Sequence, residues 1–479
     1  MKKLLLLLVP LAAFAQVQID TVIHLPSQVA RSFFIPELNK LYLTGCPSDF
    51  FVLDCSTYQL KAQIPVQTGL THFSWNWRRQ KLYIAANAGP DSTLVIDAAA
   101  DSIVGWLKVC REMHTDAYLS DVDRLYGPAR DTLYEFDCAA DTVIRRLPIH
   151  STCASWDSVG QKLYVGEGSL KKLYVYDYIA DSCIKEIDVS AVSTDMPDAV
   201  IFNHNHHRGY VGRFAGGPFG GNVGIFDTER DTLLGVLPAR IWNGLYSQVA
   251  VNERDGKVYI ADSDAEYTTP DTLWVVDCAT DSVLKKLECV SRGHPHQCIR
   301  WVPWSNRIYL VNLYPDGIHR SSLVVIDCNT DSVIVPGLFL GDNTDAAIQD
   351  IVLDSVNERV FVIGGQDSAV YVLRDTGYAG VADAKPAGTR PVAGLQLQMT
   401  SGGYEVGYSI ASPSRVDLLV YDLMGREVRR LVGADQPAGQ HRVVWDSRNH
   451  GGSVVAHGVY FVRLDTPNFS DVKKAVVTR

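Results

Sequence analysis

Six polar residues occupy similar places in a repeated sequence pattern and could together form a binding or catalytic site. Each lies 11 to 13 residues before a tyrosine that recurs along the chain; they are His72, His114, Cys153, Asp198, Gln248 and His296. A last repeat could add Asp345 or Asp350. Imidazole and carboxylate groups suit zinc, iron, manganese or nickel, and a thiolate favours zinc or copper. The pattern therefore predicts converging polar groups that could hold a divalent metal.

Three interpretations of this set remain open. A bound divalent metal would fit a metal-assisted, lactonase-like hydrolase. The same residues could instead line a polar, water-filled channel mouth, or bind a small molecule without a metal. Neither an H-E-x-x-H nor a G-x-S-x-G motif is present to support catalysis. We therefore expect a binding protein rather than an enzyme, predict no cofactor and name no catalytic residue.

Paired aspartates form a second candidate group, because two carboxylates close together could act as acid and base or bind Ca²⁺. The pairs recur in six repeats, as Asp97/Asp101, Asp137/Asp141, Asp177/Asp181, Asp227/Asp231, Asp277/Asp281 and Asp327/Asp331. Each pair flanks a tight turn, where an aspartate hydrogen-bonds its own backbone. This recurrence favours a structural role. A third cluster, His204, His206 and His207, precedes a strand and favours a solvated turn.

An internal repeat of about 45 residues defines the elements that position these groups. Its first segment resembles KLYV and recurs eight times, starting at Lys40, Lys81, Arg124, Lys162, Arg208, Lys257, Arg307 and Arg359. A second segment resembles TLVID, and a third begins D-[ST], as in DTVIRRL. All three are short and rich in β-branched or aromatic residues, which is typical of strands. Four strands in about 45 residues make one blade of a β-propeller.

The two ends of the repeated region bear on the number of blades. The eighth repeat has a third strand at Ala369–Asp375 but no fourth. Residues 19–25, IDTVIHL, resemble the missing fourth strand. We therefore expect the N-terminal strand to complete the last blade, which removes open edges and gives a ring of eight blades. A seven-bladed ring with one decayed repeat is the alternative.

The repeat, K-L-Y-V followed by V-x-V-I-D and D-x-V, is similar to the YVTN-type β-propeller repeats of exported bacterial and archaeal proteins. The similarity spans residues 19–375. It implies the fold more than the function, because such propellers include surface proteins, binding scaffolds and a few enzymes.

A second domain follows a linker. Residues 377–390 are rich in Gly, Ala and Pro and separate a propeller at 16–376 from a domain at 391–479. About seven short strands in that domain predict a small Ig-like β-sandwich. It resembles the FlgD-type Ig-like domain and the C-terminal sorting domain of type IX secretion. The matching segments are VYDLMGR from Val420, PAGQH from Pro437, Trp445-Asp446, GVYFVR from Gly458 and KKAVV from Lys473. This resemblance implies a role in export or surface retention.

The N-terminus also predicts export. Residues 1–15 combine a basic start, an apolar stretch and an A-F-A ending before Gln16, which is the pattern of a secretory signal peptide. A later run of 18 apolar residues is absent, so we expect no transmembrane segment and a secreted or cell-surface protein. Its partners would be an extracellular protein or glycan, and the export machinery or cell surface. The net charge of −10 disfavours nucleic-acid binding.

The ten cysteines lie between Cys46 and Cys328. An exported protein can form disulfides. Cys46–Cys55 and Cys289–Cys298 are candidate pairs, because each flanks a short loop. Alternatively, these cysteines serve as small buried apolar residues on strands.

Overall fold

The chain divides into two compact units, Met1–Gly380 (unit 1) and Val381–Arg479 (unit 2). The computed structural model describes residues 17–46, 49–66, 70–86, 93–107, 117–129, 132–192, 197–213, 221–241, 245–262, 272–288, 298–313, 321–340, 348–365, 367–375, 394–400, 403–410, 414–422, 427–437, 439–455, 458–466 and 469–477. Strands dominate both units, which confirms an all-β protein. The described helices are single turns, η1 (His204–His206) and α1 (Leu245–Gln248). Within the described residues, no helix has the length and apolar content that a membrane span requires.

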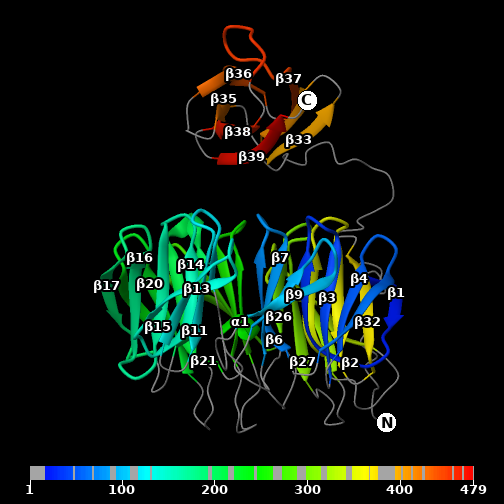
Figure 1. Ribbon diagram of the computed structural model, residues 1–479, viewed down its shortest axis with the longest axis vertical. Coiled ribbons are helices and arrows are strands. Elements are labelled where there is room, and N and C mark those ends of the chain that lie inside the picture. Colours follow the sequence, from blue (N-terminus) through cyan, green and yellow to red (C-terminus); the bar gives the residue numbers. More distant parts are fainter. Residues whose placement is uncertain are drawn as a thin grey trace, which may run out of the picture. The chain divides into compact units, whose positions relative to one another are not determined.

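Unit 1 contains, within its described residues, eight antiparallel sheets of four strands each (Figure 1). Seven of them use four strands that are consecutive in the chain, so each sheet corresponds to one sequence repeat. These strands are β2 (Gln28–Ile35), β3 (Lys40–Cys46), β4 (Asp49–Asp54), β5 (Gln59–Pro65), β6 (Leu70–Asn76), β7 (Lys81–Ala86), β8 (Thr93–Asp97), β9 (Ser102–Leu107), β10 (Ala117–Leu119), β11 (Arg124–Ala129), β12 (Thr132–Asp137), β13 (Thr142–Leu147), β14 (Ser151–Asp157), β15 (Lys162–Glu167), β16 (Lys172–Asp177), β17 (Ser182–Asp188), β18 (Pro197–Asn203), β19 (Arg208–Arg213), β20 (Gly221–Asp227), β21 (Thr232–Ile241), β22 (Val249–Asn252), β23 (Lys257–Asp262), β24 (Thr272–Asp277), β25 (Val283–Glu288), β26 (Ile299–Val302), β27 (Arg307–Leu313), β28 (Ser321–Asp327) and β29 (Ser332–Phe339).

The eighth sheet joins the two ends of unit 1. Its strands are β30 (Ile348–Asp354), β31 (Arg359–Gly364), β32 (Ala369–Asp375) and β1 (Val17–His24), and β1 pairs antiparallel with β32. The Asp20 carboxylate Oδ2 on β1 lies 2.8 Å from Nε of Arg359 and 3.0 Å from Nε of Arg374. The expected pairing of the N-terminal strand with the last repeat is therefore confirmed.

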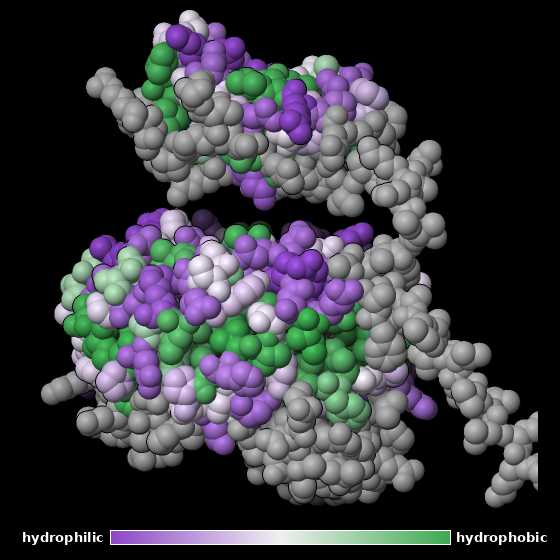
Figure 2. Space-filling view, turned by 90° about the vertical axis from the view of Figure 1, so that its right-hand side faces the viewer, coloured by the Kyte–Doolittle hydropathy of each residue, from purple (hydrophilic) through white to green (hydrophobic). Residues whose placement is uncertain are grey.

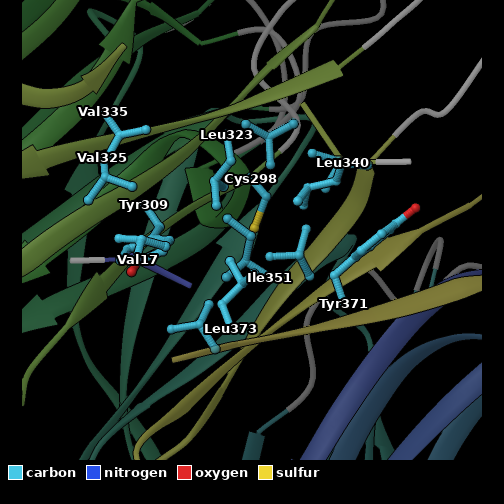
Figure 3. Packing of buried hydrophobic residues seen from close by; sticks show 14 of the residues in the cluster. Val17, Cys298, Tyr309, Leu323, Val325, Val335, Leu340, Ile351, Tyr371 and Leu373 are labelled. Carbon is cyan, nitrogen blue, oxygen red and sulfur yellow. The ribbon is translucent and has the colours of Figure 1, made fainter. Parts of the chain in front are cut away.

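Successive sheets of unit 1 contact one another through their first strands. The contacts run from β2 through β6, β10, β14, β18, β22 and β26 to β30, and β30 in turn contacts β2. The space between sheets is filled with apolar side chains. Between the seventh and eighth sheets, Tyr309, Leu323, Ile351 and Tyr371 form one buried cluster, which Val17 of β1 joins (Figure 3). The core of unit 1 is thus a series of apolar layers between neighbouring sheets.

In each sheet, the strand at the edge opposite the first strand is called the outer strand. The outer strands are β1, β5, β9, β13, β17, β21, β25 and β29. Every outer strand contains a β-bulge. A bulge leaves one extra residue unpaired in the ladder and redirects its side chain. In five outer strands the extra residue is an exposed aliphatic side chain: Val104, Ile144, Ile184, Leu234 or Leu284. One side of unit 1 shows a hydrophobic band at mid-height between hydrophilic rims (Figure 2).

The described residues of unit 2 form two antiparallel sheets that pack face to face. One has the order β33 (Gly394–Thr400), β34 (Gly403–Ile410), β37 (Gly439–Trp445), and the other β36 (Glu427–Gln436), β35 (Ser414–Asp422), β38 (Gly458–Thr466), β39 (Phe469–Val477). The buried Trp445 ring of the first sheet meets the Tyr460 ring of the second at 5.3 Å between centroids. Its indole N–H donates to the carbonyl of Arg448 at 3.0 Å, so the polar group of this core residue is satisfied.

The candidate disulfides of the sequence analysis are wrong. Cys55 and Cys298 are free thiols, so neither the Cys46–Cys55 nor the Cys289–Cys298 pair is present. Both thiols are buried among apolar residues of the layers between sheets. Cysteine here acts as a small hydrophobic residue.

Candidate functional site

The structure places four of the six predicted site residues, each in or next to the first strand of a sheet. His72 lies on β6, Cys153 on β14, Asp198 on β18, and Gln248 at the end of α1 directly before β22. β14, β18 and β22 contact one another in chain order, whereas β6 contacts β2 and β10. The convergence of all six residues therefore stays a prediction. The remaining candidates, His114, His296 and Asp345, lie outside the described residues.

Cys153 and Asp198 stand on the neighbouring strands β14 and β18, and the charge of Asp198 affects the ionisation of Cys153. Cys153 is completely buried. Burial and the negative charge of Asp198 raise the pKa of the Cys153 thiol to about 12. A thiol with this pKa stays protonated at neutral pH, which makes it a poor nucleophile and a poor metal ligand.

The segment before β22 holds the Asp198 side chain in place. The Asp198 carboxylate accepts a hydrogen bond from the N–H of Leu245, the first residue of α1. Burial raises the pKa of Asp198 to about 7. Gln248 at the other end of α1 is fully buried and donates from Nε2 to the carbonyl of Ala261 at 2.8 Å. The Gln248 amide therefore fixes α1 against β23, and Asp198 is the member of the set poised to exchange a proton near neutral pH.

Arg300 on β26 is a charged residue of this region that the sequence analysis missed. Its Nη2 donates to Oδ1 of Asp350 at 3.2 Å, and its Nη1 donates to the carbonyl of Tyr246 in α1 at 3.1 Å. Asp350 also accepts a hydrogen bond from Ser32 at 2.8 Å, which ties β30 to β2. A signal was present: Arg300 pairs with the repeat tyrosine Tyr309, and the other sheets carry an uncharged residue at this register position.

The first aspartate of each pair caps its own turn. Oδ1 of Asp97 accepts the N–H groups of Ala99 and Ala100, both at 2.9 Å. The same capping recurs at Asp137, Asp177, Asp227, Asp277 and Asp327. The expectation that these aspartates bind their own backbone is confirmed for this half of each pair.

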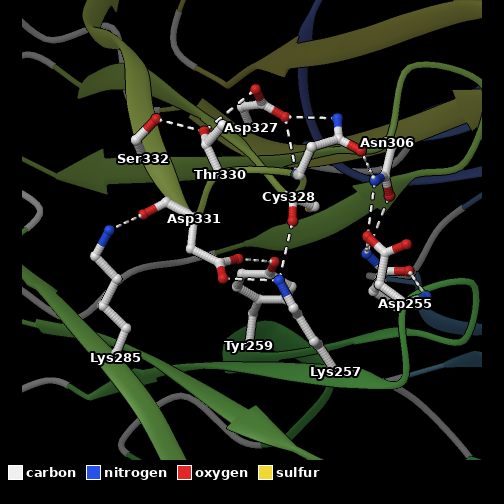
Figure 4. A network of polar contacts seen from close by, with 12 residues as sticks. Asp255, Lys257, Tyr259, Lys285, Asn306, Asp327, Cys328, Thr330, Asp331 and Ser332 are labelled. Carbon is white, nitrogen blue, oxygen red and sulfur yellow. Dashed lines mark hydrogen bonds and ion pairs between the residues drawn. The ribbon is translucent and has the colours of Figure 1, made fainter.

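The second aspartate of the pair reaches across to the preceding sheet (Figure 4). Asp331 adopts a left-handed backbone conformation, with φ of 48°, just before β29. Its two carboxylate oxygens accept hydrogen bonds from Nζ of Lys257 and the hydroxyl of Tyr259 on β23, both at 2.7 Å. The same contact joins Lys40 and Tyr42 to Asp101, Lys81 and Tyr83 to Asp141, and Lys162 and Tyr164 to Asp231. The K-x-Y and D-[ST] motifs are thus two halves of one contact between successive sheets.

Other junctions use variants of this contact. Arg208 pairs with Asp281 at 2.9 Å, and Arg145 pairs with Asp181. Arg307 and Tyr309 both bind Asp375, and the side chains of Arg307 and Asp375 are almost completely inaccessible to solvent. A buried ion pair of this kind must keep both partners, because either charge alone would be uncompensated. The repeated Lys and Arg residues and the second aspartates of the pairs therefore hold neighbouring sheets together, while the first aspartates cap turns.

His204 has a role that the sequence analysis did not predict. Its Nε2 lies 3.3 Å from Oδ1 of Asp157, and its Nδ1 lies 3.5 Å from Oε1 of Glu253. These two carboxylates raise the pKa of His204 to about 9 despite its partial burial. The charged imidazole bridges the turn after β14, η1 and the turn after β22, which belong to three sheets. The expected turn before β19 is present and His207 is exposed, while His204 is only partly exposed and is paired with the two carboxylates.

Metal binding stays a prediction. Within the described ranges, no three His, Cys, Asp or Glu side chains are grouped so that they could hold a metal ion. His114 and His296, on which the predicted set depends, lie outside those ranges.

Comparisons with known proteins place only the C-terminal unit. No curated protein matches the chain. The family model of the FlgD Ig-like domain matches residues 394–468, which include β33 to β38 and therefore strands of both sheets of unit 2. The resemblance seen in the sequence is thus confirmed for this part of the chain: unit 2 contains a FlgD Ig-like domain.

Proposed function

We propose that this protein is a binding scaffold that is secreted or displayed at the cell surface. In this proposal, residues 1–15 are a signal peptide and residues 16–376 form an eight-bladed, YVTN-type β-propeller that binds an extracellular protein or glycan. The FlgD Ig-like domain acts as an export or surface-retention module, of the kind that type IX secretion uses for sorting.

Three observations support the closed ring of eight blades. The described residues of unit 1 form eight four-stranded sheets rather than seven. Their first strands are in contact in chain order, and the last of them contacts the first. Strand β1 supplies the fourth strand of the eighth sheet, as closure of a propeller requires.

The observation that supports a binding role is that the repeated Asp, Lys and Tyr side chains are occupied in contacts between sheets. These residues, which could otherwise act as acids, bases or ligands, bind each other between sheets. Burial and the neighbouring aspartates raise the pKa values of Tyr42 and Tyr164 far above the usual value for tyrosine. Both hydroxyls therefore stay protonated and act as hydrogen-bond donors. Specificity in such a scaffold would come from the loops that connect the strands.

Export and retention can be tested in a bacterium that has type IX secretion. The full chain should reach the surface or medium, and its N-terminus should begin at Gln16. A variant that lacks residues 391–479 should be cleaved at the same place but remain in the periplasm. If the shortened chain still reached the surface, the proposed role of the FlgD Ig-like domain in export would be refuted. Retention of the full chain in the cytoplasm would refute the proposal that residues 1–15 are a signal peptide.

A metal-assisted, lactonase-like hydrolase is the second candidate, and one observation favours it. Asp198 titrates near neutral pH beside Cys153 in the predicted site region. Such a carboxyl could act as a general acid or base. The test is elemental analysis and ester and lactone turnover by the full chain and by His114→Ala, His296→Ala and Asp198→Asn. Two results together would favour the hydrolase over the binding scaffold. The wild type would hold a stoichiometric metal that both histidine variants lose, and Asp198→Asn would lose turnover.

A further inference from the structure

The outer strand β9 (Ser102–Leu107) differs in sequence from the other outer strands. Within the described residues it pairs with β8 on one edge and with nothing on the other. Charged residues and prolines on an edge strand are common protection against pairing with another chain. The outer strands β1, β5, β13, β17 and β25 each carry a charged residue, and β21 and β29 each carry a proline. β9, with the sequence SIVGWL, carries neither.

The β9 edge is also apolar and accessible. Ile103 is 39% exposed, Val104 51% and Trp106 42%. No atom lies within 4 Å of the place that a Cβ would take at Gly105, so the strand is open at its middle. The bulge at Val104 does not protect β9 in particular, because every outer strand has one.

We propose that β9 pairs antiparallel with β9 of a second copy of this chain, about a two-fold axis. Charge favours this partner. A two-fold axis sets a strand against itself, so like charges would meet if β13 paired through Arg145 and Arg146, or β25 through Lys285 and Lys286. β9 has no charge to oppose. Self-pairing satisfies the backbone groups of its free edge and removes Val104 and Trp106 from water.

The size of this contact predicts a weak dimer. Stable protein interfaces bury about 1,200–2,000 Å² in total, and a pair of six-residue strands with their flanking side chains covers less. We therefore expect a dissociation constant of about 10–100 μM, which corresponds to roughly 5–7 kcal/mol of binding free energy. The dimer would be populated where the protein is concentrated, as on a surface.

Sedimentation velocity of the full chain, over concentrations that span about two orders of magnitude around that constant, tests the proposal. The wild-type protein should shift from monomer to dimer. Trp106→Lys should remain a monomer, because it brings one added charge from each copy into a contact that is otherwise apolar. Lysine is compatible with the sheet at this position, because Lys286 occupies the equivalent place on β25, opposite Trp274 as Trp106 is opposite Leu94.

Leu284→Lys is the matched control. It places the same charge at the bulge of β25, equivalent to Val104 of β9, and should dimerise like the wild type. Hydrogen exchange gives a second readout: the amides of β9 should exchange more slowly at high concentration than at low concentration. A wild-type protein that stays monomeric throughout, as it would if β9 served an unrelated peptide, overturns the proposal. So does a dimer that survives in Trp106→Lys, or one that Leu284→Lys abolishes equally.

Discussion

The ring of Tyr58 packs edge-on against the ring of Phe361, with centroids 6.5 Å apart and planes at 80°. Tyr58, with φ of 58°, stands where other repeats carry the second aspartate, and Phe361 stands where they carry the tyrosine of K-x-Y. At the junction of the last and first sheets, both partners of the polar contact are replaced together by aromatic residues. Phe34 extends this apolar contact, with its ring 6.5 Å from that of Phe361.

Restoring one polar partner at this junction should destabilise unit 1. Phe361→Tyr adds a hydroxyl to a buried cluster that offers it no carboxylate, which costs about 1–3 kcal/mol. Adding Tyr58→Asp should recover part of the loss, because aspartate tolerates a positive φ and can accept the hydroxyl. Urea unfolding of the wild type, both single variants and the double variant measures the coupling. A double variant as unstable as the sum of the single variants would show that the two positions act independently.

The two aspartates of one pair should differ sharply in their effect on stability. Asp101→Asn removes the countercharge of Lys40, whose side chain is almost fully buried, and should cost about 3–5 kcal/mol. Asp97→Asn changes an exposed turn cap that asparagine can replace, and should cost less than about 1 kcal/mol. Asparagine also tolerates the φ of 53° at position 101. Backbone strain therefore does not contribute to the difference in stability between the two variants. Thermal unfolding of the two variants checks this, and equal midpoints would refute the contact between sheets as a major source of stability.

The His204 bridge should make stability depend on pH in the alkaline range. The carboxylates of Asp157 and Glu253 raise the pKa of His204 to about 9, so the folded state binds this proton more tightly than the unfolded state. The stabilisation is fully present below pH about 6.5 and is lost as the pH rises through about 9. After a discount for partial exposure we expect about 1–2 kcal/mol. His204→Gln should lower stability at pH 6 but not at pH 10. His207→Gln, at an exposed position of the same turn, is the control and should have little effect at either pH.

Asp198 should add a second fall in stability with rising pH, in a lower pH range than that of His204. Burial raises the pKa of Asp198 to about 7, so the folded state holds this proton over a range in which the unfolded state has lost it. Stability should therefore fall between pH about 4 and 7, by about 1–3 kcal/mol. In Asp198→Asn this part of the fall should vanish, as unfolding at pH 5 and pH 8 would measure. Asp188→Asn, on the exposed strand β17, should keep the wild-type dependence. An unchanged pH profile in Asp198→Asn would mean that this carboxyl ionises normally.

Much of the secondary structure could be predicted because it depends on short-range patterns. The KLYV, TLVID and D-[ST] segments are short, β-branched or aromatic and separated by turn residues, and each forms a strand. The likeness of residues 19–25 to a fourth strand predicted the pairing of β1 with β32. The site was harder to predict. The spacing from the repeat tyrosines located His72, Cys153, Asp198 and Gln248 near first strands, but it could not show that Cys153 is buried and protonated or that Gln248 holds α1.

The sequence by itself determined the strands, the turn caps and the order of the repeats, because period-two patterns and turn residues act within a few positions of each other. Only the tertiary structure decided which polar groups meet. Lys257 and Asp331 lie 74 residues apart, and their contact exists because one sheet packs against the next. The replacement of this contact by Tyr58 and Phe361 follows the same rule, since those two residues meet only where the last sheet packs against the first. Side chains so distant in sequence carry no local signal of their partner, and packing between sheets supplies it.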